Sequence, residues 1–185
     1  MRRTFRTTTA LLAAILSLPA CTGESEKLAY ANQEANIDKF VTAALSADEG
    51  RRSVMNGGSV RVVLSEGEGP ELGADGMVSL YYAGFVFTGG TSLQLSSMFA
   101  TNDSALAESA GWDTSDSEAF TVKALSLGEG KLLPGLKAGL EGVRAGEECV
   151  ILFSAKYGYG DRSSGTIPAM SALAYQIKVV GISEQ

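Results

Sequence analysis

Residues 132–177 read LLPGLKAGLEGVRAGEECVILFSAKYGYGDRSSGTIPAMSALAYQI and decide which elements must pack together. Leucines three and four residues apart, with a proline in the first turn, predict a short amphipathic helix over residues 133–142. The apolar run over 148–154 predicts a buried strand, and a tyrosine-rich turn and a loop then lead to an alternating strand over 173–182. This order of elements indicates a helix whose apolar stripe lies on a sheet.

The segments before this stretch carry further strand patterns. Apolar residues alternate over 59–65 and over 77–87, and residues 120–127 form another strand-like run. Residues 100–118 are instead rich in Ser, Asp and Ala and predict a surface insertion, with one helical turn over 104–109. We therefore predict an α+β domain in which an antiparallel β-sheet is wrapped around one short helix.

The first residues have the features of a targeting segment. Three arginines precede an apolar run over residues 10–18, which is too short to span a bilayer as a helix. The following Leu18–Cys21 (LPAC) resembles the lipobox of bacterial lipoproteins, which implies cleavage before Cys21 and acylation of this residue. The alternative is an ordinary secretory signal with an unrelated cysteine. Thr22 is not the Asp that retains some lipoproteins at the inner membrane, so we expect a bacterial cell envelope protein, lipid-anchored at the outer membrane.

The chain divides into four parts at these signals. We predict a lipoprotein signal peptide over residues 1–20, a flexible polar tether over 21–27, a helix and linker over 28–50, and the folded domain over 51–185. Apolar residues at helical spacing define the N-terminal helix over 28–45. Its apolar face can pack on the domain or mediate dimer contacts, and the sequence leaves both alternatives open.

The amino-acid composition excludes several kinds of site. The chain has no histidine, which excludes Ser-His-Asp and Cys-His nucleophiles and histidine-bound metals. Residues 128–131 (GEGK) do not complete a phosphate-binding loop, and no cysteine pair has metal-ligand spacing, so no cofactor or metal is predicted. The formal net charge is −6, and loss of the three arginines of the signal lowers it to −9, so nucleic acid is not expected to bind. Cys149 lies in an apolar run and is expected to be a buried, unreactive thiol.

Four short motifs follow one another along the chain: VSLYYAG at 78–84, KLLPGLKAGLEGVRAGE at 131–147, YGYG at 157–160 and TIP at 166–168. Their order and spacing resemble the FKBP family of peptidyl-prolyl cis/trans isomerases, and the resemblance covers residues 58–183. It implies an FKBP-like fold and isomerisation of X-Pro bonds in unfolded or nascent polypeptides. Together with the predicted signal peptide, this makes exported polypeptides the expected substrates. The resemblance also implies that no cofactor is needed and makes macrolides candidate inhibitors, while the sequence leaves open whether they fit beside the insertion.

Prolyl isomerisation requires little functional-group chemistry. Resonance keeps the amide planar, and rotation about its C–N bond costs about 18–20 kcal/mol. The amide loses resonance and charge separation as it twists, so an apolar pocket stabilises the twisted form relative to the planar one. A few hydrogen-bond donors then suffice to hold the carbonyl of the residue before proline.

The resemblance also assigns individual residues. It places the proline ring among six apolar or aromatic side chains, which are Tyr82, Phe99, Leu132, Leu133, Leu136 and Tyr175. It makes the Tyr159 hydroxyl and the backbone N–H of Ile167 the catalytic hydrogen-bond donors, and Pro168 fixes the turn that presents this N–H. The strand and helix residues have ordinary core packing as their alternative role. Tyr159 instead lies in a glycine-flanked turn, where a large aromatic side chain has little packing role.

Two positions depart from the family pattern. Leu136 stands where the pocket floor of many members is a tryptophan, and Phe99 is followed by Ala100 where the family has an aspartate. Asp103 can take that place only if the loop bends differently. These departures motivate an alternative function, in which the chain is a non-catalytic FKBP-like peptide-binding or chaperone module.

The insertion is a third departure. It lies at the expected pocket edge and obscures the next aromatic residue of the pocket, for which Phe120 and Trp112 are the candidates. Trp112 is the only tryptophan and has loop-like neighbours. It is therefore either part of a small local core or an exposed contact residue.

Overall fold

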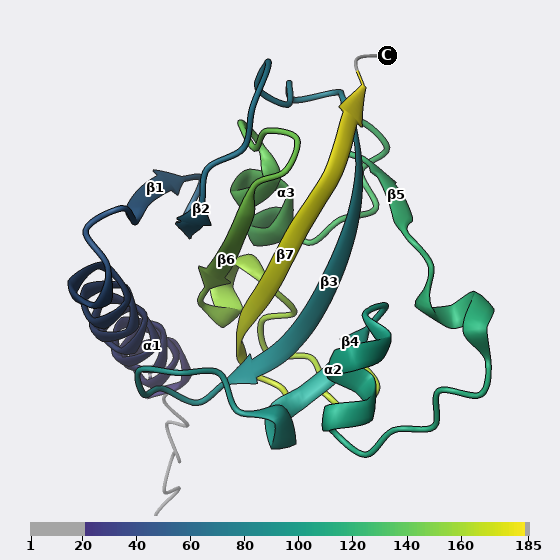
Figure 1. Cartoon of the computed structure of the whole chain (residues 1–185). Helices are drawn as coiled ribbons and strands as arrows, with labels where there is room; N and C mark the ends of the chain where they lie inside the picture. The colour runs from purple at the N-terminus through teal and green to yellow at the C-terminus, as the bar shows by residue number, and fades with distance from the viewer. Residues whose placement is uncertain (1–20, 184–185) are drawn as a thin grey trace, which may run out of the picture.

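The computed structural model describes residues 21–183, and its sheet confirms the predicted fold class. In this part of the chain seven strands form one sheet in the order β1-β2-β6-β7-β3-β4, with β5 paired to β3, and every pair is antiparallel (Figure 1). The strands are β1 (Arg52–Asn56), β2 (Ser59–Ser65), β3 (Met77–Phe87), β4 (Met98–Thr101), β5 (Lys123–Ser126), β6 (Glu148–Phe153) and β7 (Ala172–Ser183). The two longest strands, β3 and β7, pair along the whole of β3 and form the long axis of the sheet.

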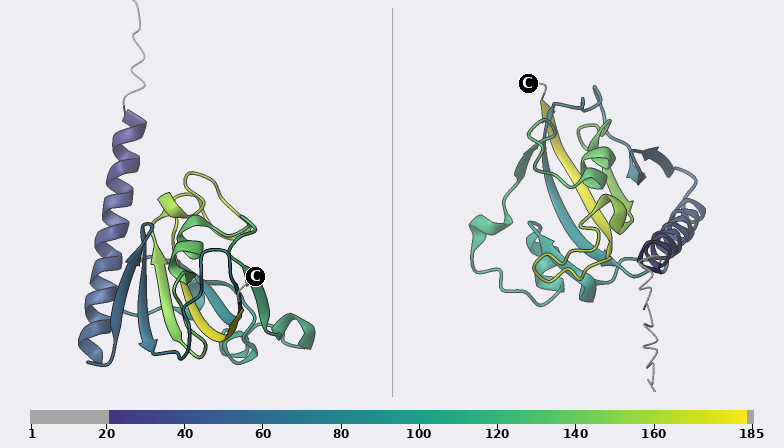
Figure 2. Two further views of the ribbon diagram at one scale, coloured as in Figure 1. Left: turned by 90° about the horizontal axis from the view of Figure 1, so that it is seen from above. Right: turned by 180° about the vertical axis from the view of Figure 1, so that it is seen from behind.

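Three α-helices and three short 3₁₀ helices accompany the sheet within residues 21–183. They are α1 (Cys21–Ala47), α2 (Ser104–Ser109), α3 (Pro134–Leu140), η1 (Leu95–Ser97), η2 (Ser117–Phe120) and η3 (Ala155–Tyr157). Seen from behind, α3 lies in front of the curved sheet, whereas α1 lies beside the β1–β2 hairpin (Figure 2). None of the helices in the described part of the chain combines the length and the apolarity needed to cross a membrane.

Strand β6 shows why both faces of the sheet are covered. Its side chains alternate in direction: Cys149, Ile151 and Phe153 join the core under α3, whereas Val150 and Leu152 join a second core under α1. All five are buried, because the strand lies inside the sheet with neighbours on both sides. The expectation for Cys149 is confirmed, since burial raises the pKa of its thiol far above the ordinary value.

Helix α3 lies very close to β6 because two of its residues are glycines. A Cβ atom on Gly135 would lie 2.3 Å from the Phe153 ring, and one on Gly139 would lie 2.2 Å from the Ile151 side chain. Neither contact is sterically allowed in a close-packed core, so the glycines set the distance between helix and strand. The close approach also brings Leu136 onto the sheet, where it is buried.

The C-terminal part of α1 packs on the domain, which is the first of the two roles predicted for this helix. Ile37, Phe40 and Ala44 are buried and lie three and four residues apart, so they share one helix face. The Phe40 ring meets Phe87 edge to face, with a centroid distance of 5.7 Å and an interplanar angle of 86°. The apolar face of the helix is thereby occupied within the chain itself.

The same helix replaces the predicted tether. Residues 21–27 continue α1 instead of forming a flexible segment, and residues 23–28 are exposed where the helix projects past the sheet (Figure 2). Glu24 in the first turn interacts favourably with the helix dipole, and Tyr30 donates a hydrogen bond to Glu26 one turn earlier. The prediction failed because polar composition suits an exposed helix as well as a tether.

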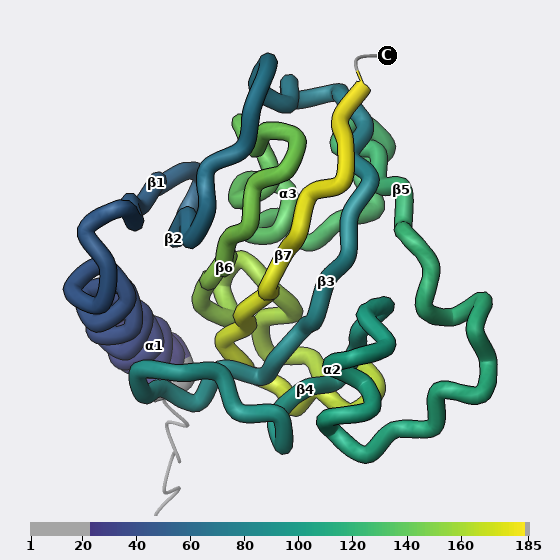
Figure 3. Tube along the Cα trace, in the orientation of Figure 1, coloured from purple at the N-terminus to yellow at the C-terminus, as the bar shows by residue number. Residues whose placement is uncertain are grey.

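The predicted insertion over residues 100–118 forms part of an outer loop that extends away from the edge of the sheet. The chain runs from β4 through α2 and then along an extended path to β5 (Figure 3). The buried Asn102 side chain holds both ends of this loop: it accepts from the Tyr82 N–H at 2.6 Å and donates to the carbonyls of Leu80 and Thr121. The predicted helical turn over 104–109 is confirmed as α2.

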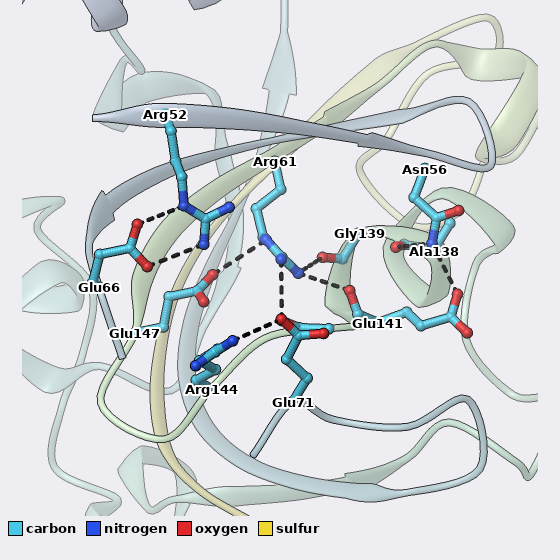
Figure 4. Close-up of polar contacts among 11 residues, drawn as sticks. Arg52, Asn56, Arg61, Glu66, Glu71, Ala138, Gly139, Glu141, Arg144 and Glu147 are labelled. Carbon is cyan, nitrogen blue, oxygen red and sulfur yellow. Dashed lines mark hydrogen bonds and ion pairs between the residues drawn. The ribbon is translucent and has the colours of Figure 1, made fainter. Parts of the chain in front are cut away.

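A buried ion pair ties β2 to the segment that follows α3 (Figure 4). The Arg61 Nε and the Glu147 Oε1 are 3.2 Å apart, and both side chains are buried. The Arg61 guanidinium also donates to the carbonyls of Gly139, Glu141 and Gly142. One side chain therefore satisfies the end of α3, whose last carbonyls have no partner within the helix.

Candidate functional site

An apolar cavity of about 270 Å³ opens between the sheet and α3. Four of the six side chains predicted to surround a proline ring line it, namely Tyr82, Leu132, Leu136 and Tyr175. They come from β3, from the segment before α3, from α3 itself and from β7. The antiparallel pairing of β3 with β7 and the close packing of α3 therefore assemble a hollow from distant parts of the sequence.

Tyr175 lies in the middle of an aromatic wall. Its ring packs edge to face on Phe99, with a centroid distance of 5.8 Å, and stacks on Phe153 at 6.0 Å. Phe99, the fifth predicted side chain, therefore supports the cavity through Tyr175. Burial raises the pKa of the Tyr175 hydroxyl, and the nearby hydroxyls of Tyr159 and Tyr82 raise it further, so this phenol stays uncharged.

A second hollow adjoins the cavity at Leu132, which lines both. Leu133 and Tyr159, the remaining predicted site residues apart from Ile167, line this second hollow. The Tyr159 hydroxyl makes no hydrogen bond with any residue of the described chain, so it is free to bind a ligand. The cavity and the second hollow thus form one surface with an apolar end and a hydrogen-bonding end.

The structure contradicts the donor role predicted for Ile167. Its N–H is already donated to the Ser164 carbonyl at 2.9 Å, and the Ser164 N–H donates in return to the Ile167 carbonyl at 3.0 Å. Gly165, with a φ of 57°, permits the tight turn between them. The TIP motif overlaps this turn, which spans residues 164–167, but it does not show that the turn uses the Ile167 N–H internally.

Leu133 presents a free backbone N–H instead. It directly precedes the first turn of α3, where N–H groups have no partner within the helix, and its N–H bonds to no other residue of the described chain. Its carbonyl accepts from the Lys137 N–H at 2.9 Å, which ties Leu133 to the first turn of α3. The proline at position 134 marks the start of the helix in the sequence, so this donor was available to sequence reasoning.

Four further residues line the cavity and were missed: Leu80, Lys123, Leu125 and Ile177. Lys123 and Leu125 face the same way because they are two residues apart in β5, which pairs with β3 beside Leu80. Their alternation within the predicted strand was the signal that could have found them. Of the described residues that line the cavity, only Lys123 is charged at neutral pH. The cavity therefore suits a small apolar ring and carries no carboxylate for proton transfer.

Residues 74–180 match the family model described as FKBP-type peptidyl-prolyl cis-trans isomerase. The chain belongs to this family. The match contains every residue that lines the cavity, so the cavity lies within the isomerase domain. The chain is therefore an FKBP-type peptidyl-prolyl cis/trans isomerase.

Individual relatives agree with this assignment. FK506-binding protein 1 of Aspergillus oryzae is 25% identical over 126 residues, which cover 68% of this chain and 99% of that protein. FK506-binding protein 2 of Podospora anserina is 41% identical over 56 residues, which cover 30% of each chain. The match thus spans nearly all of the first relative and about a third of the second.

Solved structures show the same fold. FkpA from Escherichia coli aligns with a TM-score of 0.56 at 17% identity, covering 88% of this chain and 64% of that chain. A peptidyl-prolyl cis-trans isomerase from Pseudomonas syringae aligns with a TM-score of 0.55 at 19% identity, covering 83% of this chain and 95% of that chain. At this level of identity the likeness supports the fold alone.

The FKBP domain accommodates both departures from its family pattern. Leu136 is 8% exposed and keeps the cavity apolar at this position. Ala100 lies in β4, and Asp103 does not replace the absent aspartate. The Asp103 carboxylate instead caps α2 by accepting from the N–H groups of Ala105 and Leu106.

Neither aromatic candidate from the insertion lines the cavity of the FKBP domain. Phe120 lies half-buried in η2, and Trp112 is 37% exposed in the loop after α2. The hydrogen bond from Asn102 to Thr121 closes the loop that carries both rings before β5 begins. Lys123 and Leu125 line this side of the cavity in their place.

Proposed function

We propose that this isomerase acts on X-Pro bonds of unfolded or nascent polypeptides exported to a bacterial cell envelope, where a lipid on Cys21 anchors it to the outer membrane. The observation that carries the enzymatic part is the apolar cavity of Tyr82, Leu136 and Tyr175 beside the unpaired Tyr159 hydroxyl. The anchor is supported by the sequence around Cys21. The predicted signal peptide, residues 1–20, lies outside the described residues.

The cavity supplies the affinity for proline. Each methylene that the ring buries contributes about 0.8 kcal/mol, and the apolar walls disfavour the charge separation of the planar amide. Both effects act on the reacting bond without any covalent step. The substrate class is therefore set by the presence of a proline ring rather than by a charged side chain.

Two donors hold the carbonyl of the residue before proline in this proposal. The Leu133 N–H and the Tyr159 hydroxyl both lie at the second hollow and are unpaired within the described chain. A substrate carbonyl that binds there displaces only water, so the new bond costs no internal hydrogen bond. Together they hold one side of the amide while the other side turns in the cavity.

Tyr159→Phe is expected to lower kcat/KM about three- to tenfold, because it removes one hydrogen bond to the substrate. Stability should stay within about 0.5 kcal/mol of the wild type, because the hydroxyl has no partner in the protein. The measurement is the rate of proline-limited refolding of a model protein, with thermal unfolding recorded in parallel.

Tyr81→Phe is the matched control, since Tyr81 is half-buried and lines neither the cavity nor the second hollow. It should keep wild-type activity. Equal activity in both variants would contradict the donor role of Tyr159. A folded wild-type protein that binds an unfolded client without accelerating its refolding would favour the non-catalytic module instead.

Cys21→Ser is expected to abolish acylation and to move the protein from the membrane fraction to the soluble fraction of a bacterial host. The physical reason is that several acyl chains on one residue give stable membrane binding, whereas one chain gives only marginal binding. The measurement is incorporation of a labelled fatty acid, followed by fractionation. Cys149→Ala serves as the control and should retain the label, since Cys149 is buried. An exported wild-type chain without label would indicate an ordinary secretory signal.

The same cavity is proposed to bind FK506-like macrolides. The names of the Aspergillus oryzae and Podospora anserina relatives describe them as FK506-binding proteins. Such a ligand would fill the apolar cavity of Leu136 and Tyr175 and exclude the proline ring. Inhibition would then be competitive with the polypeptide substrate.

A further inference from the structure

A closed ring of four hydrogen bonds joins α1 to the loops beside the site. The Gln33 side-chain carbonyl accepts from the Ala155 N–H at 2.8 Å, and its amide donates to the Met170 carbonyl at 2.7 Å. The Ala155 carbonyl accepts from the Gly160 N–H at 2.9 Å, and the Gly160 carbonyl accepts from the Met170 N–H at 2.7 Å. The ring thus begins and ends at Gln33 and encloses the turn that carries Tyr159.

The loops that contain Tyr159 and Met170 both have backbone features that make their hydrogen bonds to Gln33 important. Met170 is the one non-glycine residue of the described chain with a positive φ, 58°, a conformation that surrounding contacts must hold in place. Tyr159 lies between Gly158 and Gly160, so its own turn is intrinsically flexible. Neither loop is part of a strand, and Gln33 is the side chain that bonds to both.

We propose that Gln33 is a positioning residue of the isomerase site, which fixes the Tyr159 hydroxyl relative to the cavity through Ala155 and Met170. The inference rests on the donor role proposed above for Tyr159. Gln33 does not line the cavity or the second hollow, so it acts through the loops rather than on the substrate. It also makes α1 a component of the active site, although the helix lies outside the residues 74–180 that match the family.

Gln33→Met tests this role, because methionine keeps the length of the side chain and removes both hydrogen bonds. We expect kcat/KM to fall about three- to tenfold at a temperature where the variant is fully folded, since small displacements of a catalytic group lower the rate strongly. Asn32→Met is the matched control: Asn32 is the neighbouring, exposed residue of α1 and should keep wild-type activity. Wild-type activity in Gln33→Met would overturn the inference.

A combination with Tyr159→Phe separates positioning from a general loss of structure. If Gln33 acts by placing the Tyr159 hydroxyl, the double variant should be scarcely less active than Tyr159→Phe alone, because no hydroxyl remains to be placed. If the double variant lost activity by the product of the two single fold-decreases in kcat/KM, Gln33 would not act by positioning Tyr159. A loss in Tyr159→Phe with none in Gln33→Met overturns this inference alone, whereas wild-type activity in Tyr159→Phe overturns the proposed donor role together with it.

Discussion

Replacing Arg61 by methionine is expected to lower the free energy of unfolding by about 3–5 kcal/mol, the cost of leaving a buried carboxylate without its counter-ion. In the native protein the Arg61 Nε lies 3.2 Å from the Glu147 Oε1, and neither side chain is exposed. The contact is close but not aligned as a hydrogen bond, so the attraction is mainly that of two opposite charges. The variant also removes the donor that satisfies the carbonyls after α3.

The loss of stability in Arg61→Met should depend on pH with a defined sign. Burial raises the pKa of Glu147 above the ordinary value of 4.5, and Arg61 acts in the opposite direction. Without Arg61 the pKa of Glu147 should rise further. A carboxyl with a higher pKa in the folded state contributes stability that is fully present below its unfolded pKa and is lost as the pH rises through its folded pKa. The free energy of unfolding of the variant should therefore be closest to that of the wild type in acid and furthest below it at neutral pH.

Urea unfolding over a pH series measures both effects. Arg52→Met is the matched control, because Arg52 pairs with Glu66 at the surface, where the side chains are 44% and 50% exposed, and its loss should cost less than about 1 kcal/mol. The double variant Arg61→Met/Glu147→Leu should recover part of the lost stability, since no unpaired charge remains buried, while the carbonyls after α3 still lack their donor. A double variant no more stable than Arg61→Met would show that the ion pair is not the cause.

Tyr175→Ala is expected to damage stability and activity together. The side chain is 7% exposed and packs against Phe99 and Phe153, so its truncation should cost about 3–5 kcal/mol through the cavity it leaves. The same truncation removes one wall of the proline cavity. We expect kcat/KM of the folded variant to fall about tenfold or more, because the apolar enclosure of the twisted amide is lost.

Two controls separate the ring of Tyr175 from its hydroxyl and from general truncation. Tyr175→Phe keeps both ring contacts and should stay within about 1 kcal/mol of the wild type. Tyr81→Ala removes a similar ring away from the cavity and should leave kcat/KM unchanged. Chemical unfolding and proline-limited refolding, measured on the same samples, test these expectations. A fully active Tyr175→Ala would show that this wall does not enclose the substrate.

The elements of the fold could be predicted from the sequence because their signals are local. Alternation over 59–65 and 77–87 became β2 and β3, and the leucines around Pro134 became α3. The pocket side chains followed from the resemblance to the FKBP family, and the structure places Tyr82 and Tyr175 on the face of the sheet that α3 covers. The tether was mispredicted because composition does not distinguish an exposed helix from a flexible segment.

The sequence by itself therefore determined the order of the elements, the apolar character of the cavity and the exclusion of histidine-based chemistry. Only the tertiary structure decided how the polar groups away from the helix ends are paired. It closed the Ile167 N–H onto Ser164, buried Arg61 against Glu147, and brought Gln33 to loops more than a hundred positions away. The reason is that periodicity depends on neighbours in the chain, whereas each of these pairings depends on how closely separate segments approach after the core has packed.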